Sequence, residues 1–595
     1  MTFSTHTRQW WKEAVVYQIY PASFCDSNGD GIGDLPGITS KLDYLANLGV
    51  NVIWVSPMYD SPQVDMGYDI ANYEAVYPPY GTVEDMEVLI RETHARGMKI
   101  MLDLVINHTS DQHQWFKESR SSKDNPKRDW YIWRPPRYSP EGKRLPPNNW
   151  RAAWGPISAW EWDETTQEYY FHIFAAQQPD LNWENPEARK AIYASSMEFW
   201  LKRGVDGFRI DVVNMYSKPT AFPDAEIIDP TTPFQPASTL FCNGPRMHEF
   251  LAEMSAIFTK YNAITVGELP NTPDLQDVLR YVSADSQKLN MVFQFDVVTV
   301  GMGSDITYDA KPRDFTLPDF KRAVDATQSL ISNTDGWTTV FLENHDQARS
   351  ISRFADDRPE FRVRSAKLLA LMQACLTGTQ YIYQGQEIGT VNAPKALYPL
   401  ENYIDIGSIG HIASIKEKYG AENKEELEKA FDALAYFARD HGRLPICWSG
   451  GLYGGFSEEA EKQGKEVQRP WMESHPLAKE INVADQLDDP GSVLAFWRRM
   501  LGFRREYKDL LVYGDFRDLR PDNEDLFVFV KESERGKALV VLNFTTGERG
   551  FVLLGKEELG VQEKVDLELI MSTHGEVREK EVLGALEGRV YLVKQ

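Results

Sequence analysis

The sequence has 595 residues, of which 42% are hydrophobic and 12% aromatic, and its formal net charge is -24. This composition predicts a large folded core and excludes a disordered chain. The acidic balance disfavours nucleic acid and anionic membranes as partners, because both attract basic patches, and it leaves neutral substrates open.

The cysteines and the absence of long apolar runs indicate the compartment. The four cysteines stand far apart without a Cys-x-x-Cys pair, so neither a zinc site nor a disulfide framework is expected. The N-terminal segment lacks a signal peptide, and no uncharged apolar run reaches the roughly 18 residues of a membrane helix. A glycan on the sequon Asn107-His108-Thr109 would block the site assigned below. We therefore expect a cytoplasmic protein that does not bind membranes.

Short apolar, β-branched segments alternate with helical patterns, such as residues 82–96 and 186–203, over most of the chain. The predicted strands, in chain order, are residues 15–20, 51–56, 99–106, 205–212, 263–268, 290–295, 338–342 and 380–383. Eight strands with intervening helices predict an α/β fold, a (β/α)₈ TIM barrel. A doubly wound open sheet is the alternative, and the lack of a Gly-rich dinucleotide turn after the first strand disfavours it.

Two long segments interrupt the alternation of strands and helices. Residues 109–180 follow the third strand and are rich in Trp, Pro and Asn, which predicts a small inserted subdomain. A second insertion, partly helical, is expected near residues 390–480. Residues 513–595 contain alternating apolar patterns and predict a C-terminal β-sandwich domain. The barrel then consists of residues 1–108 and 181–512.

Carboxyl groups stand at the ends of predicted strands, where barrels of this kind form their active sites. Asp211 ends the fourth strand, and Arg209, two residues earlier, points to the same face and would keep Asp211 ionised, as a nucleophile requires. Glu268 ends the fifth strand, where partial burial would suit a general acid. Taken singly, Asp211 and Arg209 could form a structural salt bridge, and Glu268 could be a solvated loop acid.

Two further strand ends strengthen this interpretation. His345 and Asp346 follow the seventh strand and could bind sugar hydroxyl groups, and Asp103 and His108 belong to the third. Retaining glycosidases use two carboxyl groups about 5–5.5 Å apart, one as nucleophile and one as acid/base. The combined set of strand-end acids therefore predicts sugar chemistry.

The motifs Asp103-Leu-Val-Ile-Asn-His108, Gly207-Phe-Arg-Ile-Asp211, Gly267-Glu268 and Glu343-Asn-His-Asp346 resemble those of glycoside hydrolase family 13, the α-amylase family, in the same order. The resemblance implies that Asp211 is the nucleophile, Glu268 the acid/base and Asp346 the third catalytic carboxylate. It also implies that His108, Arg209 and His345 bind the glucosyl unit.

Further motifs resemble the oligo-1,6-glucosidase and yeast maltase-isomaltase group. They are Gln178-Pro-Asp-Leu-Asn-Trp183, Gly67-Tyr68-Asp69-Ile70 and Arg439-Asp-His-Gly-Arg443. The resemblance implies that Tyr68 stacks on the sugar, that Asp69 pairs with Arg443 to close a glucose pocket, and that Phe174 and Gln178 line it. Such an enzyme would be an exo-acting, retaining α-glucosidase. The sequence departs from the group at Leu444-Pro-Ile-Cys-Trp448, where Thr-Pro-Met-Gln-Trp is commoner.

The Gly-rich segment from Asp26 to Asp34 offers alternating oxygen atoms that suit Ca²⁺, and an Asx-rich turn is the alternative. In relatives a structural Ca²⁺ is bound here, which implies Asp26, Asn28, Asp30, Asp34 and the Ile32 carbonyl as ligands. No organic cofactor is expected.

The residue after the nucleophile bears on the choice of linkage. Val212 resembles the isomaltase pattern, whereas Thr or Ala accompanies maltases, so α-1,6 cleavage is favoured. A single such side chain changes specificity by only about 1–3 kcal/mol, and packing within the barrel is the alternative function of Val212. A transglucosylase or sucrose isomerase with the same triad is an alternative. A non-catalytic binding member, such as a transporter ectodomain subunit, is disfavoured because all three acids are present.

Overall fold

The computed structural model describes residues 6–302, 315–332, 334–551, 566–575, 577, 579 and 581–594. Eight parallel strands form its central sheet in the order β13-β12-β11-β5-β2-β1-β15-β14, and a bridge between Val292 and Thr338 joins the two ends. The strands are β1 Val15–Ile19, β2 Val52–Val55, β5 Lys99–Leu104, β11 Gly207–Ile210, β12 Ile264–Glu268, β13 Met291–Phe293, β14 Thr339–Val340 and β15 Thr379–Tyr383. The predicted (β/α)₈ barrel is confirmed, with strands shorter than most predicted segments.

The barrel strands are apolar on both faces because one face fills the barrel and the other meets the surrounding helices. Val16, Trp54 and Met101 belong to one buried cluster, whereas the intervening Tyr17 and Ile53 pack in a second. This alternation follows from the two-residue period of a strand.

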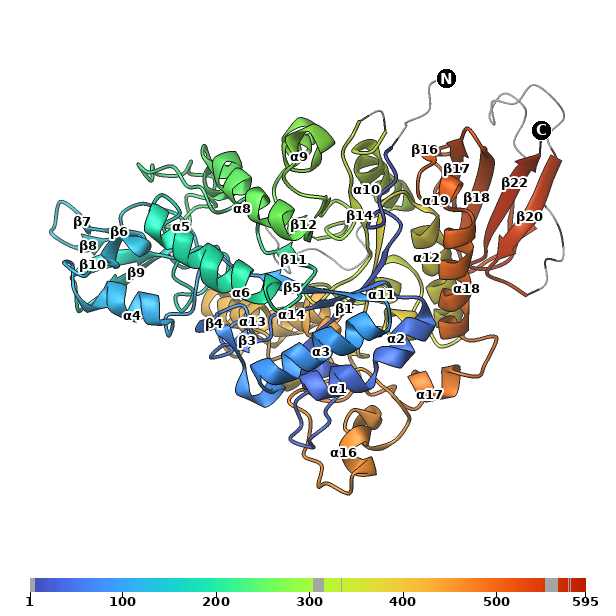
Figure 1. Ribbon diagram of the computed structural model, residues 1–595, viewed down its shortest axis with the longest axis horizontal. Coiled ribbons are helices and arrows are strands. Elements are labelled where there is room, and N and C mark those ends of the chain that lie inside the picture. The colour runs from blue at the N-terminus through green and yellow to red at the C-terminus, as the bar shows by residue number, and fades with distance from the viewer. Residues whose placement is uncertain are drawn as a thin grey trace.

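Helices connect the strands and cover the barrel (Figure 1). They include α1 Leu35–Ser40, α2 Leu42–Leu48, α3 Val83–Ala95, α5 Pro186–Ile192, α6 Phe199–Leu201, α8 Met247–Tyr261, α9 Leu275–Val282, α10 Leu317–Ser329, α12 Arg362–Cys375 and α18 Val493–Glu506. The predicted helical pattern over 186–203 forms α5 and α6 with a π-helical turn, Tyr193–Glu198, between them.

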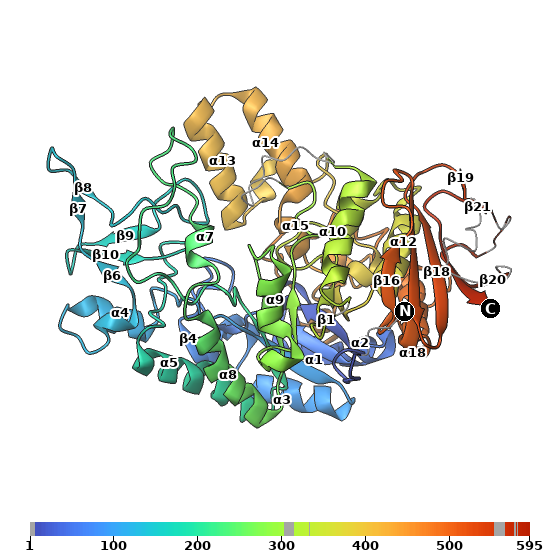
Figure 2. The same ribbon diagram turned by 90° about the horizontal axis from the view of Figure 1, so that it is seen from above.

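The segment after β5 leaves the barrel. It contains α4 Gln114–Ser121, a small sheet of β6 Trp133–Arg134, β9 Trp160–Asp163 and β10 Glu168–Phe171, and the hairpin β7 Arg137–Tyr138 with β8 Arg144–Leu145. These elements lie at one end of the molecule and the C-terminal sheet at the other (Figures 1 and 2).

The second insertion forms a helical pair, α13 Ile406–Tyr419 and α14 Lys424–Phe437, and the helical pattern of the sequence, residues 421–438, corresponds to α14. The short helix α15 Asp440–Arg443 follows it. Figure 2 shows α13 and α14 packed side by side at the edge of the barrel. They therefore bring the 390–480 insertion against the strand ends that carry the acids.

The C-terminal region forms a five-stranded antiparallel sheet in the order β16-β17-β18-β22-β20 and a two-stranded sheet. The strands are β16 Asp515–Asp518, β17 Leu526–Ser533, β18 Gly536–Asn543, β20 Asp566–Ser572 and β22 Gly588–Lys594, with β19 Arg549–Gly550 paired to β21 Val582–Leu583. This agrees with the predicted all-β domain. In the part of the chain that the structure describes, no helix is both long and apolar enough to cross a membrane.

Candidate active site

Arg209 lies at the centre of the strand-end acids. Its strand, β11, pairs with β5 and β12, and Arg209 is the direct partner of Asp103 across the β5–β11 pair. One guanidinium nitrogen of Arg209 donates to Asp103 Oδ1 at 2.8 Å and to Asp211 Oδ1 at 2.7 Å. The other lies 2.7 Å from Glu268 Oε2. Three strands thus deliver three carboxyl groups to one buried cation.

Arg209 lowers the pKa of Asp211, as the sequence predicted, but the net pKa shift of Asp211 is upward. Burial raises the pKa values of Asp211 and of Asp103, and Arg209 only partly offsets this effect. One guanidinium cannot balance three carboxylates in a buried site. Burial and the shared cation therefore act in opposite directions on the pKa values of Asp211 and Asp103.

Asp346 has the opposite electrostatic environment. Burial would raise its pKa, but His345, Arg439 and Arg443 lower it well below the ordinary value. Arg439 donates to Asp346 Oδ1 at 3.0 Å, Arg443 donates to the same oxygen at 2.8 Å, and His345 Nε2 lies 2.9 Å from Oδ2. Asp346 is therefore held ionised beside the shared cluster.

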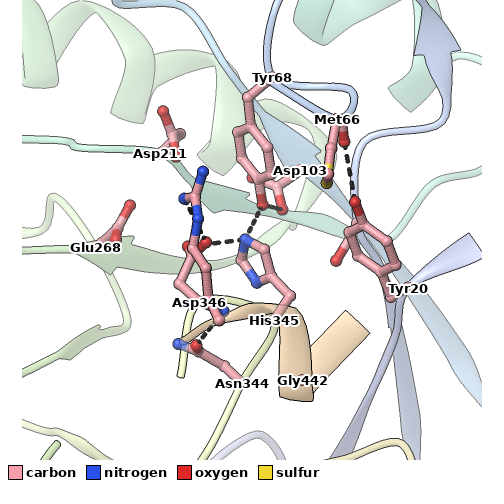
Figure 3. Close-up of polar contacts among 12 residues, drawn as sticks. Tyr20, Met66, Tyr68, Asp103, Asp211, Glu268, Asn344, His345, Asp346 and Gly442 are labelled. Carbon is pink, nitrogen blue, oxygen red and sulfur yellow. Dashed lines mark hydrogen bonds and ion pairs between the residues drawn. The ribbon is translucent and has the colours of Figure 1, made fainter. Parts of the chain in front are cut away.

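Tyr68 and His345 form a rigid wall of the site. Their rings stack with centroids 5.2 Å apart and an interplanar angle of 5°. The Tyr68 hydroxyl lies 2.6 Å from His345 Nε2 and donates to Asp103 Oδ2 at 3.1 Å. Figure 3 shows Asp211, Glu268 and Asp346 gathered beside this pair. A stacked, hydrogen-bonded wall of this kind suits one face of a sugar ring.

Residues of the inserted subdomain complete the same wall. His108 Nε2 lies 3.0 Å from the Tyr68 carbonyl oxygen and 3.2 Å from the Gln178 side chain. The Phe174 ring meets His108 edge-on at 5.2 Å. Burial lowers the pKa of His108, so it is a neutral hydrogen-bonding group. The structure thus brings the predicted His108, Gln178, Phe174 and Tyr68 together.

Val212, the residue after Asp211, contacts the Glu268 side chain through its main chain. Its main-chain N–H donates to Glu268 Oε2 at 3.1 Å. The Val212 backbone has a φ of 35°, in the left-handed region that β-branched residues rarely adopt. Its side chain packs in a buried apolar cluster with Ile173, Met215 and Phe222. The position next to Asp211 therefore affects Glu268 as well as the apolar lining.

The predicted ion pair between Asp69 and Arg443 is wrong. Asp69 is fully buried and accepts hydrogen bonds from Ser61 Oγ and from the N–H groups of Val64 and Asp65. Both carboxylate oxygens of Asp69 accept hydrogen bonds from residues of its own loop, so Asp69 stabilises that loop and does not pair with Arg443. Burial raises its pKa to about 6.

The observed ion pair joins Asp65 and Arg439, at 2.9 Å. Each residue lies four positions before its counterpart in the predicted pair: Arg439 begins its motif, and Asp65 stands two residues before Gly67. Asp65 also accepts from the Gln178 side chain at 3.1 Å. Sequence reasoning missed this pair because each segment offers two residues of the same charge, Asp65 and Asp69 in one and Arg439 and Arg443 in the other.

Asp405 is a second residue that sequence reasoning missed. It caps the start of α13, and its two oxygens accept from Arg439 Nε at 2.7 Å and from Arg443 at 2.9 Å. The helical insertion thereby fixes both arginines that contact Asp346. Nothing in the sequence pattern around Asp405 indicates this function, because its partners lie 34 and 38 residues away.

The Gly-rich loop from Asp26 to Asp34 satisfies many of its oxygens internally. Asp26 accepts N–H groups of Asn28, Gly29 and Gly31, and Asp34 accepts those of Ser27 and Gly37. In the described ranges no group of three or more acidic, His or Cys side chains converges as metal ligands. The oxygen donors have the right chemistry for Ca²⁺, but their present arrangement is that of an Asx-rich turn, so calcium binding stays a prediction.

Comparisons with known proteins agree with this geometry. The family model described as alpha amylase, catalytic domain, matches residues 18–514. An α-glucosidase of Candida albicans is 51% identical over 98% of this chain and 99% of its own length, and an oligo-1,6-glucosidase of Saccharomyces cerevisiae is 48% identical over 99% of both. The isomaltulose synthase of Erwinia rhapontici NX5, solved as a mutant with sucrose, superposes with a TM-score of 0.89 at 35% identity, covering 99% of this chain and 100% of that one.

Proposed function

We propose that this chain, which belongs to glycoside hydrolase family 13, the α-amylase family, releases single terminal glucose units with Asp211 as nucleophile. Its relatives show that it is a glycoside hydrolase of the α-glucosidase type. The observation that carries this proposal is the Arg209 cluster, in which one cation holds Asp211 and Glu268 at adjacent strand ends. Two carboxyl groups so arranged suit double displacement at a sugar carbon.

The proposed reaction has two steps. In the first, an Asp211 oxygen bonds to the anomeric carbon while the glycosidic bond breaks and Glu268 gives its proton to the leaving oxygen. In the second, Glu268 takes a proton from water, the water oxygen bonds to the anomeric carbon, and the bond to Asp211 breaks. Asp346, held ionised by its arginines, would accept hydrogen bonds from the sugar hydroxyls and stabilise the oxocarbenium-like transition state.

The proposal that the enzyme acts at chain ends rests on the Asp65–Arg439 pair. Arg439 is buried, touches Asp65, Asp346 and Asp405, and lies 4.5 Å from the centre of the Trp154 ring. A charged pair directly beside the third carboxylate leaves little room for a further sugar beyond the bound glucose. It therefore supports a pocket with a closed end, as an exo-acting enzyme needs.

The linkage preference follows from Val212. Valine at this position resembles the isomaltase pattern, and its side chain, which packs with Ile173, Met215 and Phe222, keeps the site apolar there; this supports α-1,6 over α-1,4 substrates, with overlap between them. Transfer of glucose to a sugar, or isomerisation of sucrose, is the second candidate. It is favoured by the similarity to an isomaltulose synthase and a trehalulose synthase whose structures superpose on this chain.

We place the enzyme in the cytoplasm. The four cysteines, Cys25, Cys242, Cys375 and Cys447, are all buried and unpaired. Burial raises each thiol pKa to about 12, which keeps the thiols protonated and unreactive. Unpaired thiols of this kind suit a reducing compartment.

The deciding experiment measures products from isomaltose, maltose, nigerose and sucrose, with Asp211→Asn as the blank. We expect free glucose as the main product, faster release from isomaltose than from maltose, and a loss of orders of magnitude in the variant. Near-normal turnover by Asp211→Asn would refute the nucleophile assignment. A main product that is a new disaccharide would favour the transferase or isomerase.

A further inference from the structure

A cavity lies away from the residues that surround Asp211. Its volume is about 630 Å³, within the range of small-molecule sites. It opens between the hairpin of β3 Tyr59–Asp60 with β4 Asn72–Val76 and the beginning of α4. None of the residues assigned above to the acids or to the glucose wall lines it. The cavity is therefore a separate site rather than an extension of the glucose pocket.

One wall of the cavity is aromatic and rigidly held. The half-buried Trp115 ring lies 4.4 Å from the His113 ring and 6.0 Å from the Tyr73 ring, measured between centroids. The Trp130 ring meets it edge-on at 5.2 Å. A large ring fixed by three neighbours presents its surface without an ordering cost on binding. Such a surface fits the flat C–H face of a pyranose.

The polar groups around this ring are available to a ligand. The carboxylates of Asp60 and Glu74 and the ammonium group of Lys117 line the cavity, and in the described part of the chain none of the three forms a side-chain hydrogen bond or ion pair. Carboxylates accept hydrogen bonds and the ammonium group donates them. Both types of group are needed to bind hydroxyls, each of which donates and accepts.

The charge balance selects the class of ligand. Two carboxylates against one ammonium leave a net negative charge, which disfavours phosphates and other anions. His113 is neutral because burial, with Lys127 and Lys117, lowers its pKa to about 3. Across the described ranges no cluster of three metal-ligating side chains exists, so a cation site is not built here either. A neutral, hydroxyl-rich molecule is the class that remains.

We propose that this cavity is an accessory carbohydrate site that binds a neutral glucosyl oligosaccharide against Trp115, separately from the pocket at Asp211. The choice of glucosyl ligands rests on the proposed function. The carbohydrate class rests only on the cavity. Saccharide in the cavity would lie against the hairpin whose Ser61 Oγ holds Asp69, so both sites share that loop.

The test is calorimetric titration of the intact Asp211→Asn protein with isomaltose, maltotriose and inorganic phosphate. We expect two saccharide-binding events and none with phosphate. Trp115→Ala should weaken the second event by about tenfold, equivalent to about 1.4 kcal/mol, and leave the first unchanged. Glu74→Gln, a mild surface change, should weaken the same event, whereas Tyr138→Ala removes an aromatic ring of 64% exposure outside the cavity and should not.

The two proposals fail in different ways. A single binding event, or two events that neither Trp115→Ala nor Glu74→Gln weakens, would overturn the accessory site. Phosphate binding that Lys117→Met abolishes would replace it with an anion site. The proposed function is tested independently by glucose release from the wild-type enzyme, so its failure would appear in the products and not in the titration of the inactive variant.

Discussion

Val212 turns its main-chain N–H to Glu268 Oε2, at 3.1 Å, by adopting a φ of 35°. Such a conformation in a β-branched residue costs about 1–3 kcal/mol, and it persists only where the surrounding structure imposes it. Here the next residue, Val213, donates its N–H to the Glu268 carbonyl oxygen at 3.0 Å. The strained backbone at Val212 thus holds the Glu268 side chain beside Asp211.

A change confined to the side chain of Val212 tests the linkage preference without removing the main-chain N–H that contacts Glu268. Val212→Thr keeps the N–H that holds Glu268, so kcat for an aryl α-glucoside should change less than threefold, well under about 1 kcal/mol. The ratio of kcat/KM for isomaltose over maltose should fall by about tenfold, within the scale of one pocket contact. Steady-state kinetics on the three substrates measures both. An unchanged ratio would show that the linkage preference is set elsewhere.

The arginines around Asp346 predict a pH effect. Arg439 and Arg443 lower the pKa of Asp346, so removing part of that charge contact raises the pKa. In Arg439→Lys the two-pronged contact with Asp65 and Asp405 is lost. Where the acid limb of the kcat/KM profile reports the ionisation of Asp346, that limb should move to higher pH. Activity at neutral pH should fall by about 100-fold, as expected when a buried charge contact is weakened.

The matched control for this change is Arg96→Lys, which alters a surface ion pair with Asp43 and should leave the pH profile unchanged. An acid limb that stays in place in Arg439→Lys, together with lower activity, would mean that Arg439 binds substrate without tuning Asp346.

The sequence allowed prediction of the barrel and its acids because a strand end is a local feature. Asp211 and Glu268 could be placed from apolar runs that stop at a carboxyl group, and parallel pairing then brings them together. The ion pair between Asp65 and Arg439 could not be placed in the same way. Asp65 and Asp69 both lie in one loop, and only the hydrogen bonds of Ser61 to Asp69 show which carboxylate is free to meet a cation.

The contacts of Asp405 could not be predicted from the sequence for a different reason. Its contact with Arg443 spans 38 residues and depends on how α13 docks on the barrel. Helix α13 itself is weakly amphipathic and buries only Ser408 fully, so its sequence carries little periodic signal. Contacts that depend on docking, rather than on local pattern, are the ones that sequence reasoning could not supply.

The calcium expectation predicts a measurable gain in stability. If Asp26, Asp30 and Asp34 bind Ca²⁺, adding CaCl₂ to EDTA-treated protein raises the melting temperature, because a ligand of the native state stabilises it by mass action. The gain should be at least about 1 kcal/mol at tenfold excess over Kd. Asp30→Asn should reduce it, and MgCl₂ should not replace CaCl₂. Equal melting curves with and without CaCl₂ would leave the Asx-rich turn as the whole explanation.

The buried side chain of Lys531, on β17, should make the stability of the native protein depend on pH. It is fully buried between the C-terminal sheet and the barrel, where it donates to Thr377 Oγ1 and to the Gly514 carbonyl oxygen. Burial lowers its pKa from 10.5 to about 7. Between these two values the unfolded chain binds the proton and the native chain does not, so this group's contribution makes stability rise with pH. Below about pH 7 both states are protonated and the full cost of burying the charge remains.

Lys531→Met removes that cost, and Thr377 Oγ1 still donates to the Gly514 carbonyl oxygen at 2.9 Å, so this buried carbonyl keeps a donor. We expect the variant to be more stable than wild type by about 1–3 kcal/mol at pH 6, with the gain shrinking toward pH 9. Thermal unfolding at both pH values measures it, with Lys508→Met, which removes a partly exposed contact to Glu13, as the control. A variant that is destabilised equally at pH 6 and pH 9 would show that the hydrogen bonds of Lys531 outweigh its burial. The docking of the two domains would then depend on this charge.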